Sequence, residues 1–244
     1  MRNLKLVIEY DGTNYRGWQS QKNVPTIQNT IETSLSRILN HKVRLIGSGR
    51  TDSRVHAFGQ VANFKTDSSI PIPSLLKGVN SLLPPDILIK EIEEVASDFH
   101  ARYSAKSRVY EYHIWNEALP SVFRRNYFWW IREKLEVELM EKAALHLLGW
   151  HDFSSFQGSD HEVISPEREV IKVGFRQEGS ELTFSIQANA FLRHMVRNIM
   201  GTLVEVGKKR ISPDDFVKIF KACDRREAGI TAPAKGLFLK CVFY

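Results

Sequence analysis

The chain has 244 residues, 43% of them hydrophobic and 11% aromatic, so it can bury a sizeable core as one large or two small domains. Its 34 Lys and Arg against 28 Asp and Glu give a net charge of +6, which suits nucleic acid or an anionic membrane equally. No run approaches the roughly 18 apolar residues of a membrane span, and no signal peptide is visible, so we expect a cytoplasmic protein without membrane attachment. Cys223 and Cys241 have neither metal-ligand nor disulfide spacing, and we expect reduced thiols.

The chain opens with an apolar alternation over residues 4–10, which predicts a strand, and Asp11-Gly12 predicts the turn that ends it. The segment 13–21 is polar apart from two aromatic residues, one of them Trp18. Such a loop is typical of RNA contacts, but a loop tryptophan folded back onto the core is about as common. The pattern leaves both interpretations open.

Two helices are predicted in the first hundred residues. Thr26 is a plausible N-cap for the first, in which apolar residues recur at helical spacing as far as Leu39. The second follows Pro73 and is ended by the proline pair at 84–85. A strand over 87–95 completes an alternation of strands and helices.

The glycine-rich stretch 47–57 lies between two apolar runs, 43–46 and 60–64, that predict strands, so it should form a loop. Its one carboxylate, Asp52, is flanked by arginines at positions 50 and 54. Guanidinium groups close to it would favour the ionised carboxylate, which can act as a nucleophile. By pattern alone, however, a solvated turn with an incidental ion pair is the commoner structure.

A period-two pattern over 108–115 predicts a strand with Arg108, Tyr110 and Tyr112 on one face. Burial of the two rings is the commoner fate of tyrosines in strands. The segment 116–132 is rich in arginine and aromatic residues, and we interpret it as a connection between two halves of the molecule.

A helix with leucines between 135 and 147 is predicted next, with Gly149 as its C-cap. His151 and Asp152 then suggest a dyad or a metal site. Adjacent side chains rarely converge in regular structure, and no third ligand is spaced nearby, so we discount this interpretation.

Two apolar runs within 170–188 predict a hairpin. A helix should begin in the segment 189–201, where Arg193 and Arg197 are four residues apart and so share a face. Ser212 should cap the last helix, and alternation in the tail predicts a closing strand.

Five separated blocks of the chain resemble the tRNA pseudouridine synthase A family. The most specific block is similar to the catalytic signature of that family, and it reads Arg50-Thr51-Asp52-Ser53-Arg54-Val55-His56-Ala57. The other matching blocks are Tyr10-Asp11-Gly12-Thr13 with Gly17-Trp18-Gln19, the Tyr-x-Tyr strand at 110–112, the helix at 189–201 and the tail at 224–239. Segment 157–169 departs from the family wording, so its nucleic-acid contacts are not carried over.

The resemblance implies roles for particular residues. Asp52 would be the catalytic nucleophile, and Tyr110 would stack on the target uracil. Arg197 would pair with Asp52, and Leu237 would line the uracil pocket.

Two arginines of the loop receive supporting roles. Arg50 would help Arg197 to keep Asp52 ionised. A uridine in a stem must be extruded to be reached, and Arg54 or a neighbour would fill the gap it leaves.

The family also implies an α+β fold of two similar halves, each an antiparallel sheet backed by helices, with the active cleft between them. We place these halves at 1–115, with the Asp loop and Tyr strand, and at 116–244, with the Arg helix and closing strand. The implied enzyme is an isomerase, an intramolecular transferase without cofactor, that converts uridines 38 to 40 of the tRNA anticodon stem and loop to pseudouridine. The family further implies a homodimer.

Two other classes of function are weighed against this one. A non-catalytic RNA-binding or chaperone module of the same fold would need charge and aromatic residues alone, and the presence of Asp52, Tyr110 and Arg197 together argues against it. A metal-dependent nuclease would need several converging carboxylates, and the motif region offers only one, so no metal site is expected. Which of the three uridines are modified, whether other RNAs are substrates and the route of Asp52 attack are not decided by the sequence.

Overall fold

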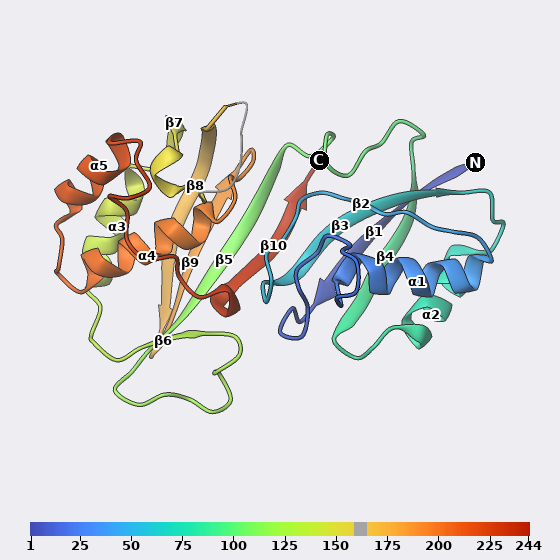
Figure 1. The fold of residues 1–244 in the computed structure, drawn as a ribbon, viewed down its shortest axis with the longest axis horizontal. Helices are drawn as coiled ribbons and strands as arrows, with labels where there is room; N and C mark the ends of the chain where they lie inside the picture. The colour runs from blue at the N-terminus through green and yellow to red at the C-terminus, as the bar shows by residue number, and fades with distance from the viewer. Residues whose placement is uncertain (159–164) are drawn as a thin grey trace. The chain divides into compact units, whose positions relative to one another are not determined.

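A computed structural model describes residues 1–158 and 165–244, and these form two compact units. The first unit contains residues 1–106 and 238–244, and the second contains residues 107–237. Both combine strands and helices, which confirms the predicted α+β class (Figure 1). These two units are defined by how the residues pack, whereas the halves 1–115 and 116–244 are defined by the two similar halves expected of the family. The division into those halves stays a prediction.

The first unit is built on a sheet with the strand order β4-β1-β3-β10, and β2 pairs with β3. The strands are β1 (Arg2–Tyr10), β2 (Ile46–Gly47), β3 (His56–Thr66), β4 (Ile87–Val95) and β10 (Leu237–Phe243). β1 runs antiparallel to β3 and to β4, while β10 runs parallel to β3. Alternate residues of β1 are fully buried, as the sequence pattern predicts.

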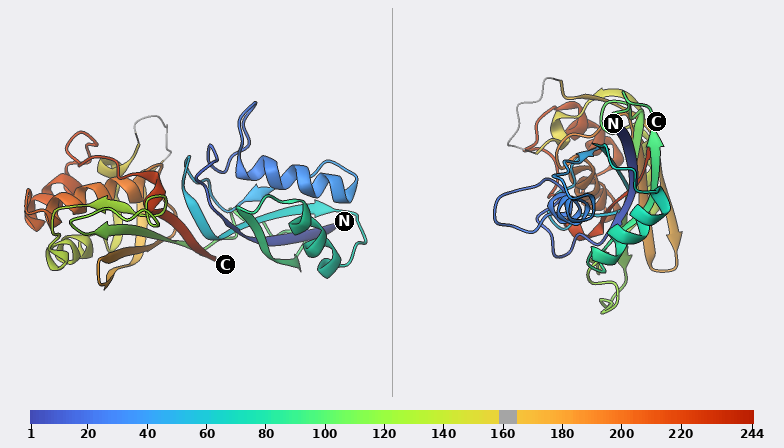
Figure 2. Two further views of the ribbon diagram at one scale, coloured as in Figure 1. Left: turned by 90° about the horizontal axis from the view of Figure 1, so that it is seen from below. Right: turned by 90° about the vertical axis from the view of Figure 1, so that its right-hand side faces the viewer.

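Two helices cover this sheet, α1 (Ile27–Leu39) and α2 (Ile72–Leu82). Thr26 is the N-cap of α1, because its side chain accepts a hydrogen bond from the amide of Asn29. Every apolar residue that α1 buries lies on one stripe, and α1 packs on α2 while α2 packs on β4. Figure 2 shows α1 lying along the strands of this unit.

The strand predicted over 43–46 is wrong except at its last residue, since β2 begins at Ile46. Helix α1 explains the difference. The amide of Val43 donates to Ser36 Oγ at 2.9 Å, and the amide of Leu45 donates to Glu32 Oε1 at 2.8 Å. Side chains of the helix therefore bind amides that a strand partner would otherwise take.

The second unit has a sheet with the strand order β5-β9-β8-β7, all antiparallel, and β6 pairs with β5 in parallel. The strands are β5 (Ser107–Asn116), β6 (Trp129–Ile131), β7 (Gly149–Asp152), β8 (Glu167–Glu178) and β9 (Glu181–Ala188). Gly179, with a φ of 59°, and Ser180 form the turn between β8 and β9. The predicted hairpin is thereby confirmed.

Three helices gather on one side of this unit (Figure 1). They are α3 (Val137–Leu145), α4 (Met195–Gly207) and α5 (Pro213–Lys221), and two short 3-10 turns are η1 (Ser154–Phe156) and η2 (Ala234–Gly236). α3 packs against α4, α5 and β8. Ser212 caps α5 in a capping box with Asp215, which confirms the predicted start of that helix.

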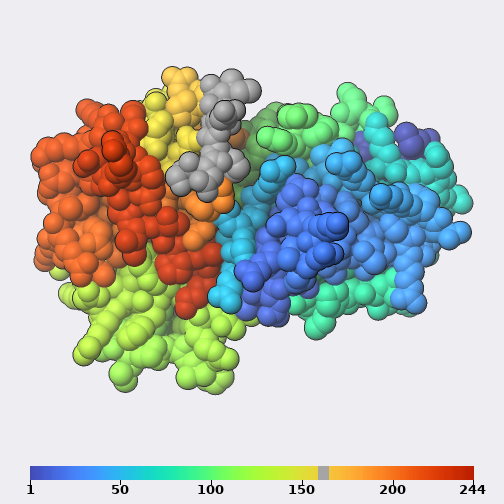
Figure 3. Space-filling view, in the orientation of Figure 1, coloured from blue at the N-terminus to red at the C-terminus, as the bar shows by residue number. Residues whose placement is uncertain are grey.

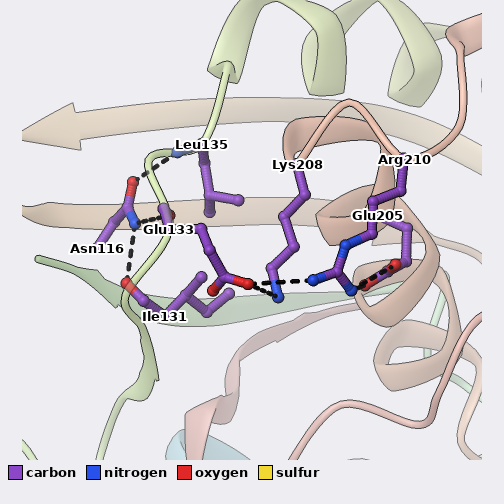
Figure 4. A network of polar contacts seen from close by, with 7 residues as sticks. All are labelled: Asn116, Ile131, Glu133, Leu135, Glu205, Lys208 and Arg210. Carbon is purple, nitrogen blue, oxygen red and sulfur yellow. Dashed lines mark hydrogen bonds and ion pairs between the residues drawn. The ribbon is translucent and has the colours of Figure 1, made fainter. Parts of the chain in front are cut away.

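The helix predicted to end at Gly149 is wrong at both ends, because α3 spans only Val137–Leu145 and Gly149 begins β7. Asn116 accounts for the late start. Its side-chain oxygen accepts from the amide of Leu135 at 3.0 Å, and its nitrogen donates to the carbonyl of Glu133 at 2.7 Å (Figure 4). These hydrogen bonds keep the chain extended where leucine spacing predicted helix.

Ion pairs fasten the same segment to the end of α4 (Figure 4). Glu133 lies 3.3 Å from Lys208 and 3.1 Å from Arg210, which also pairs with Glu205.

The segment 116–132, interpreted as a connection between halves, belongs wholly to the second unit. No helix among the described residues is long and apolar enough to span a bilayer.

Candidate active site

The loop that carries Asp52 runs from residue 48 to 55, between β2 and β3. Its first turn is anchored on Gln60, which is fully buried in β3. Ser48 Oγ donates to Gln60 Oε1 at 2.7 Å, and Gln60 Nε2 donates to the carbonyl of Gly49 at 3.1 Å. A buried amide therefore holds the loop at its N-terminal end.

Thr51, which is buried, anchors the middle of the loop. Its hydroxyl lies 2.7 Å from the Tyr10 hydroxyl, and its carbonyl accepts from the amide of Trp18 at 3.1 Å. Burial raises the pKa of Tyr10 well above its usual value, so the phenol stays neutral and keeps this hydrogen bond. The residue before Asp52 is thus fixed from two directions.

Two glycines allow the first loop to lie directly on the Asp52 loop. A β-carbon on Gly12 would stand 2.0 Å from the carbonyl oxygen of Val55. A β-carbon on Gly17, whose φ is +91°, would stand 2.6 Å from the carbonyl oxygen of Thr51. Any side chain at either position would displace the loop backbone on one side of Asp52.

Asp52 itself is partly exposed, and its carbonyl accepts from the amide of Val55 at 3.2 Å in a tight turn. Arg54 has a φ of 66°, and its side chain, like that of Arg50, is exposed. Across residues 1–158 and 165–244, neither arginine forms an ion pair with Asp52. Arg50 and Arg54 therefore do not form the local ion pairs that the sequence suggested.

His56 is a support that the sequence did not single out. It is 1% exposed, its ring stacks on Phe238 with centroids 4.6 Å apart, and its Nδ1 accepts from the amide of Gly12 at 3.1 Å. Asp11 Oδ1 also lies 3.1 Å from Nδ1. His56 thereby fixes the C-terminal end of the loop.

Tyr110 lies in β5 of the second unit, opposite Ile186, and is 8% exposed. Its ring meets the ring of Phe191 edge to face, with centroids 5.0 Å apart and an interplanar angle of 82°. Tyr110 is therefore both a buried strand aromatic, as the commoner interpretation holds, and a ring with a fixed orientation.

Tyr112, two residues later on the same strand, is fully buried and donates from its hydroxyl to the carbonyl of Pro233 at 2.7 Å. Burial raises its pKa well above the usual value. A β-carbon on Gly236 would lie 2.8 Å from the Tyr112 ring. The tail thus lies flat against Tyr112 as it approaches Leu237, which is 6% exposed.

Arg197 lies in the first turns of α4 and holds the same tail. Its Nε donates to the carbonyl of Ala232 at 2.8 Å, and the amide of Ala232 donates to the carbonyl of Arg197 at 3.1 Å. Arg193 lies before the helix, because His194 adopts a left-handed conformation and α4 begins at Met195. The expectation that the two arginines share a helix face is therefore wrong.

A buried polar network reinforces this attachment. The side-chain oxygen of Asn198 accepts from Thr231 Oγ1 at 2.7 Å and from Arg225 Nη2 at 3.2 Å. A β-carbon on Gly201 would lie 1.7 Å from the carbonyl oxygen of Ile230, so the tail backbone touches the helix there. Sequence reasoning missed this network, because its members are far apart in the chain.

The other sequence candidates take structural places. His151 Nε2 lies 2.7 Å from the carbonyl of Leu148, and its ring contacts Phe153 and Phe220. Trp18 is 2% exposed and packs on Gly47, so it belongs to the core. Among the residues that the structure describes, no group of three or more His, Cys, Asp or Glu could hold a metal ion. Residues 159–164 of the divergent segment 157–169 lie outside the described residues.

The predicted site residues are divided between the two units. Arg50, Asp52 and Arg54 lie in the first unit, whereas Tyr110, Arg197 and Leu237 lie in the second.

Comparison with known proteins gives one consistent result. The family described as tRNA pseudouridine synthase matches residues 6–104 and 143–244. The chain belongs to this family. It is 48% identical to tRNA pseudouridine synthase A of Acetivibrio thermocellus and 45% identical to that of Thermoanaerobacter sp., over the full length of both chains in each comparison. It is 43% identical over its full length to tRNA pseudouridine synthase A 2 of Clostridium perfringens.

Membership confirms the resemblance and the predicted class of enzyme, an isomerase of the tRNA pseudouridine synthase family. A solved structure described as "Crystal Structure of a Cbf5-Nop10-Gar1 Complex" covers 82% of this chain and 54% of its own, at 10% identity and a TM-score of 0.35, which is too low to support an argument.

Proposed function

We propose that this protein isomerises uridine to pseudouridine at positions 38 to 40 in the anticodon stem and loop of tRNA. Membership of the tRNA pseudouridine synthase family supports the reaction. The observation that carries the proposal is the way in which the loop holds Asp52 in place. Its carboxylate is partly exposed, yet the loop on either side is fixed by buried hydrogen bonds and by the backbone contacts of Gly12 and Gly17.

The isomerisation breaks the bond between uracil N1 and the ribose, turns the base and joins C5 to the same ribose carbon. No electron is gained or lost: C5 gives up a proton, and N1, once it is detached from the ribose, takes one up. Asp52 serves as the nucleophile: it stays bonded to the fragment that it attacks while the base turns, and it leaves when the new bond forms. Its rigid support keeps the carboxylate in place without reorganisation during the reaction.

The second unit supplies the surroundings of the base. Tyr110 provides a stacking face whose orientation is set by Phe191, and its hydroxyl takes part in proton transfer. Leu237 keeps the pocket apolar. Arg197 pairs with Asp52 and keeps it ionised, and its attachment to Ala232 aims it.

The two arginines of the loop act on the nucleic acid and on Asp52. Arg50 adds positive potential that favours the carboxylate. Arg54 fills the space that the extruded uridine leaves in the stem. Both side chains are exposed, which suits contact with a polyanion.

We further propose a cytoplasmic homodimer with tRNA as its partner. The net charge of +6 is modest for a chain that must hold a large tRNA, and a second copy would double the basic surface. Light scattering at micromolar concentration should give the mass of two chains. A fully active monomer would refute the dimer.

The deciding experiment measures tritium released from C5-labelled uridine in tRNA. The wild-type protein should release it, and Asp52→Asn, which keeps the size but removes the anion, should not. Both should shift tRNA in a gel at similar protein concentrations, because phosphate contacts position the RNA. Wild-type release by Asp52→Asn would place the catalytic residue elsewhere. A wild-type protein that bound tRNA without releasing tritium would instead be the non-catalytic RNA-binding module.

A further inference from the structure

Arg16 is an exposed cation on a rigid loop. Its amide donates to the carbonyl of Pro25 at 2.9 Å, and its carbonyl accepts from Gln21 Nε2 at 3.1 Å. In the part of the chain that the structure describes, its guanidinium makes no hydrogen bond or ion pair. Figure 3 shows this first loop, coloured blue, at the surface of the first unit. Trp18 is buried, and Arg16 is the basic side chain within residues 11–21.

The main chain places Arg16 next to the Asp52 loop. The amide of Arg54 donates to the carbonyl of Tyr15 at 3.3 Å, and Ser53 Oγ lies at the same distance from that carbonyl. Gly17, on the other side of Arg16, lies against the backbone of the same loop. The side chains of Arg16 and Arg54 therefore start from adjacent points of the backbone, beside the carboxylate proposed to react.

Within the described residues, no acidic side chain forms an ion pair with Arg16 or Arg54, although Asp52 belongs to the same loop as Arg54. Asp11 Oδ1 accepts from the amide and hydroxyl of Thr13, and Asp86 Oδ1 accepts from the Tyr15 hydroxyl at 2.6 Å. Some exposed arginines elsewhere in the chain do have acidic partners, as in the pairs Arg210–Glu205 and Arg226–Asp224. Adjacent like charges repel one another, and an anionic ligand relieves that repulsion.

We propose that Arg16 binds a phosphate of the RNA strand that carries the target uridine, alongside Arg54. The proposal rests on the proposed function, since a ribose that reaches Asp52 brings its own phosphates to this edge of the loop. The planar guanidinium matches two phosphate oxygens, and its fixed main chain reduces the entropy lost on binding. The ligand is a phosphodiester backbone, so the contact is independent of base sequence.

The test measures tRNA affinity as a function of salt, between about 50 and about 200 mM. Arg16→Gln should weaken binding and reduce the slope of log affinity against log salt by about 0.7 to 0.9, the loss of one phosphate contact. Its tritium release at saturating tRNA should equal that of the wild type. Arg16→Lys should keep the wild-type slope, because the charge remains. Arg37→Gln, which removes an exposed charge from the last turn of α1, is the matched control and should keep the wild-type slope.

A wild-type slope in Arg16→Gln would overturn the proposal, and so would an equal loss in Arg37→Gln, which would show an effect of total charge. Reduced turnover at saturating tRNA with unchanged affinity would also overturn it, since Arg16 would then act on the reaction. Absence of tritium release by the wild type would refute the proposed function alone, because the slopes would still decide whether Arg16 binds phosphate.

Discussion

Arg197 and Ala232 are joined twice, by the arginine Nε to the alanine carbonyl at 2.8 Å and by the alanine amide to the arginine carbonyl at 3.1 Å. One residue lies in helix α4 and the other in the tail that leads to Leu237. The side chain proposed to pair with Asp52 is therefore aimed by the same contact that holds the tail on the helix.

Arg197→Lys should separate charge from geometry. Lysine keeps the positive charge but lacks the Nε–H that Ala232 accepts, which leaves a carbonyl unpaired at a cost of about 1–3 kcal/mol. Turnover should fall on the order of tenfold or more, while tRNA affinity changes little. Arg176→Lys, on the exposed hairpin, is the control and should behave as wild type. Equal turnover in the two variants would contradict the role of Arg197.

Gly12→Ala should destabilise the first unit by about 1–3 kcal/mol or more, because the new methyl collides with the carbonyl of Val55. Gly49 lies in the Asp52 loop, but a β-carbon there would meet nothing within 4 Å. Gly49→Ala should therefore leave stability within about 0.5 kcal/mol of wild type or raise it slightly. Urea unfolding compares the two, and equal midpoints would show that the loop yields to the methyl group.

Tyr110→Phe keeps the stacking ring and its edge-to-face contact with Phe191, and removes only the hydroxyl. Binding of tRNA should be close to wild type, while turnover falls about a hundredfold or more, the usual contribution of a proton-transfer group. Tyr103→Phe provides the control, since Tyr103 is 76% exposed in the first unit. Loss of tRNA binding in Tyr110→Phe would assign the hydroxyl to affinity instead.

The capping box of α5 should give a stability term that depends on pH. Hydrogen bonds from Lys218 and then from Ser212 hold the pKa of Asp215 below its ordinary 3.8. Because the folded pKa lies below the unfolded one, this stability is fully present above pH 3.8 and is lost as pH falls toward the folded pKa. Asp215→Asn should therefore lower the melting temperature at about pH 7, and the difference from wild type should shrink below about pH 4. Asp214→Asn, in the same helix turn, controls for the change in charge.

Activity should survive a chelator. The reaction needs no electron transfer, and no metal-binding group of acidic, histidine or cysteine side chains occurs within the described residues. Tritium release should be equal with and without EDTA once the tRNA is confirmed to be folded. Loss of release that a divalent ion restores would contradict this expectation.

The sequence correctly predicted the start of a helix where a neighbouring residue in the chain caps it. Thr26 and Ser212 cap their helices as their side chains indicate. Ends set by distant residues could not be predicted in this way. Asn116 holds Leu135 outside α3, and the left-handed His194 delays α4 until after Arg193.

The site shows the same division between local and distant causes. The candidate site residues could be named because the resemblance to the family assigns roles to them. The residues that support them received no role from the sequence: Gln60 behind Ser48, and Phe191 beside Tyr110. Periodicity places a side chain on a face, but it does not show which distant partner that face meets.

The pairing of β10 with β3 determines when the first unit can be completed during synthesis. Phe238 lies opposite His56 in the sheet and stacks on its ring, so the end of the Asp52 loop is supported by a strand that the ribosome makes only after residues 107–236. All of residues 107–237 are translated before this strand arrives, and domains generally fold as they emerge. The first unit therefore cannot be completed, and the loop cannot acquire its full support, until β10 has left the ribosome.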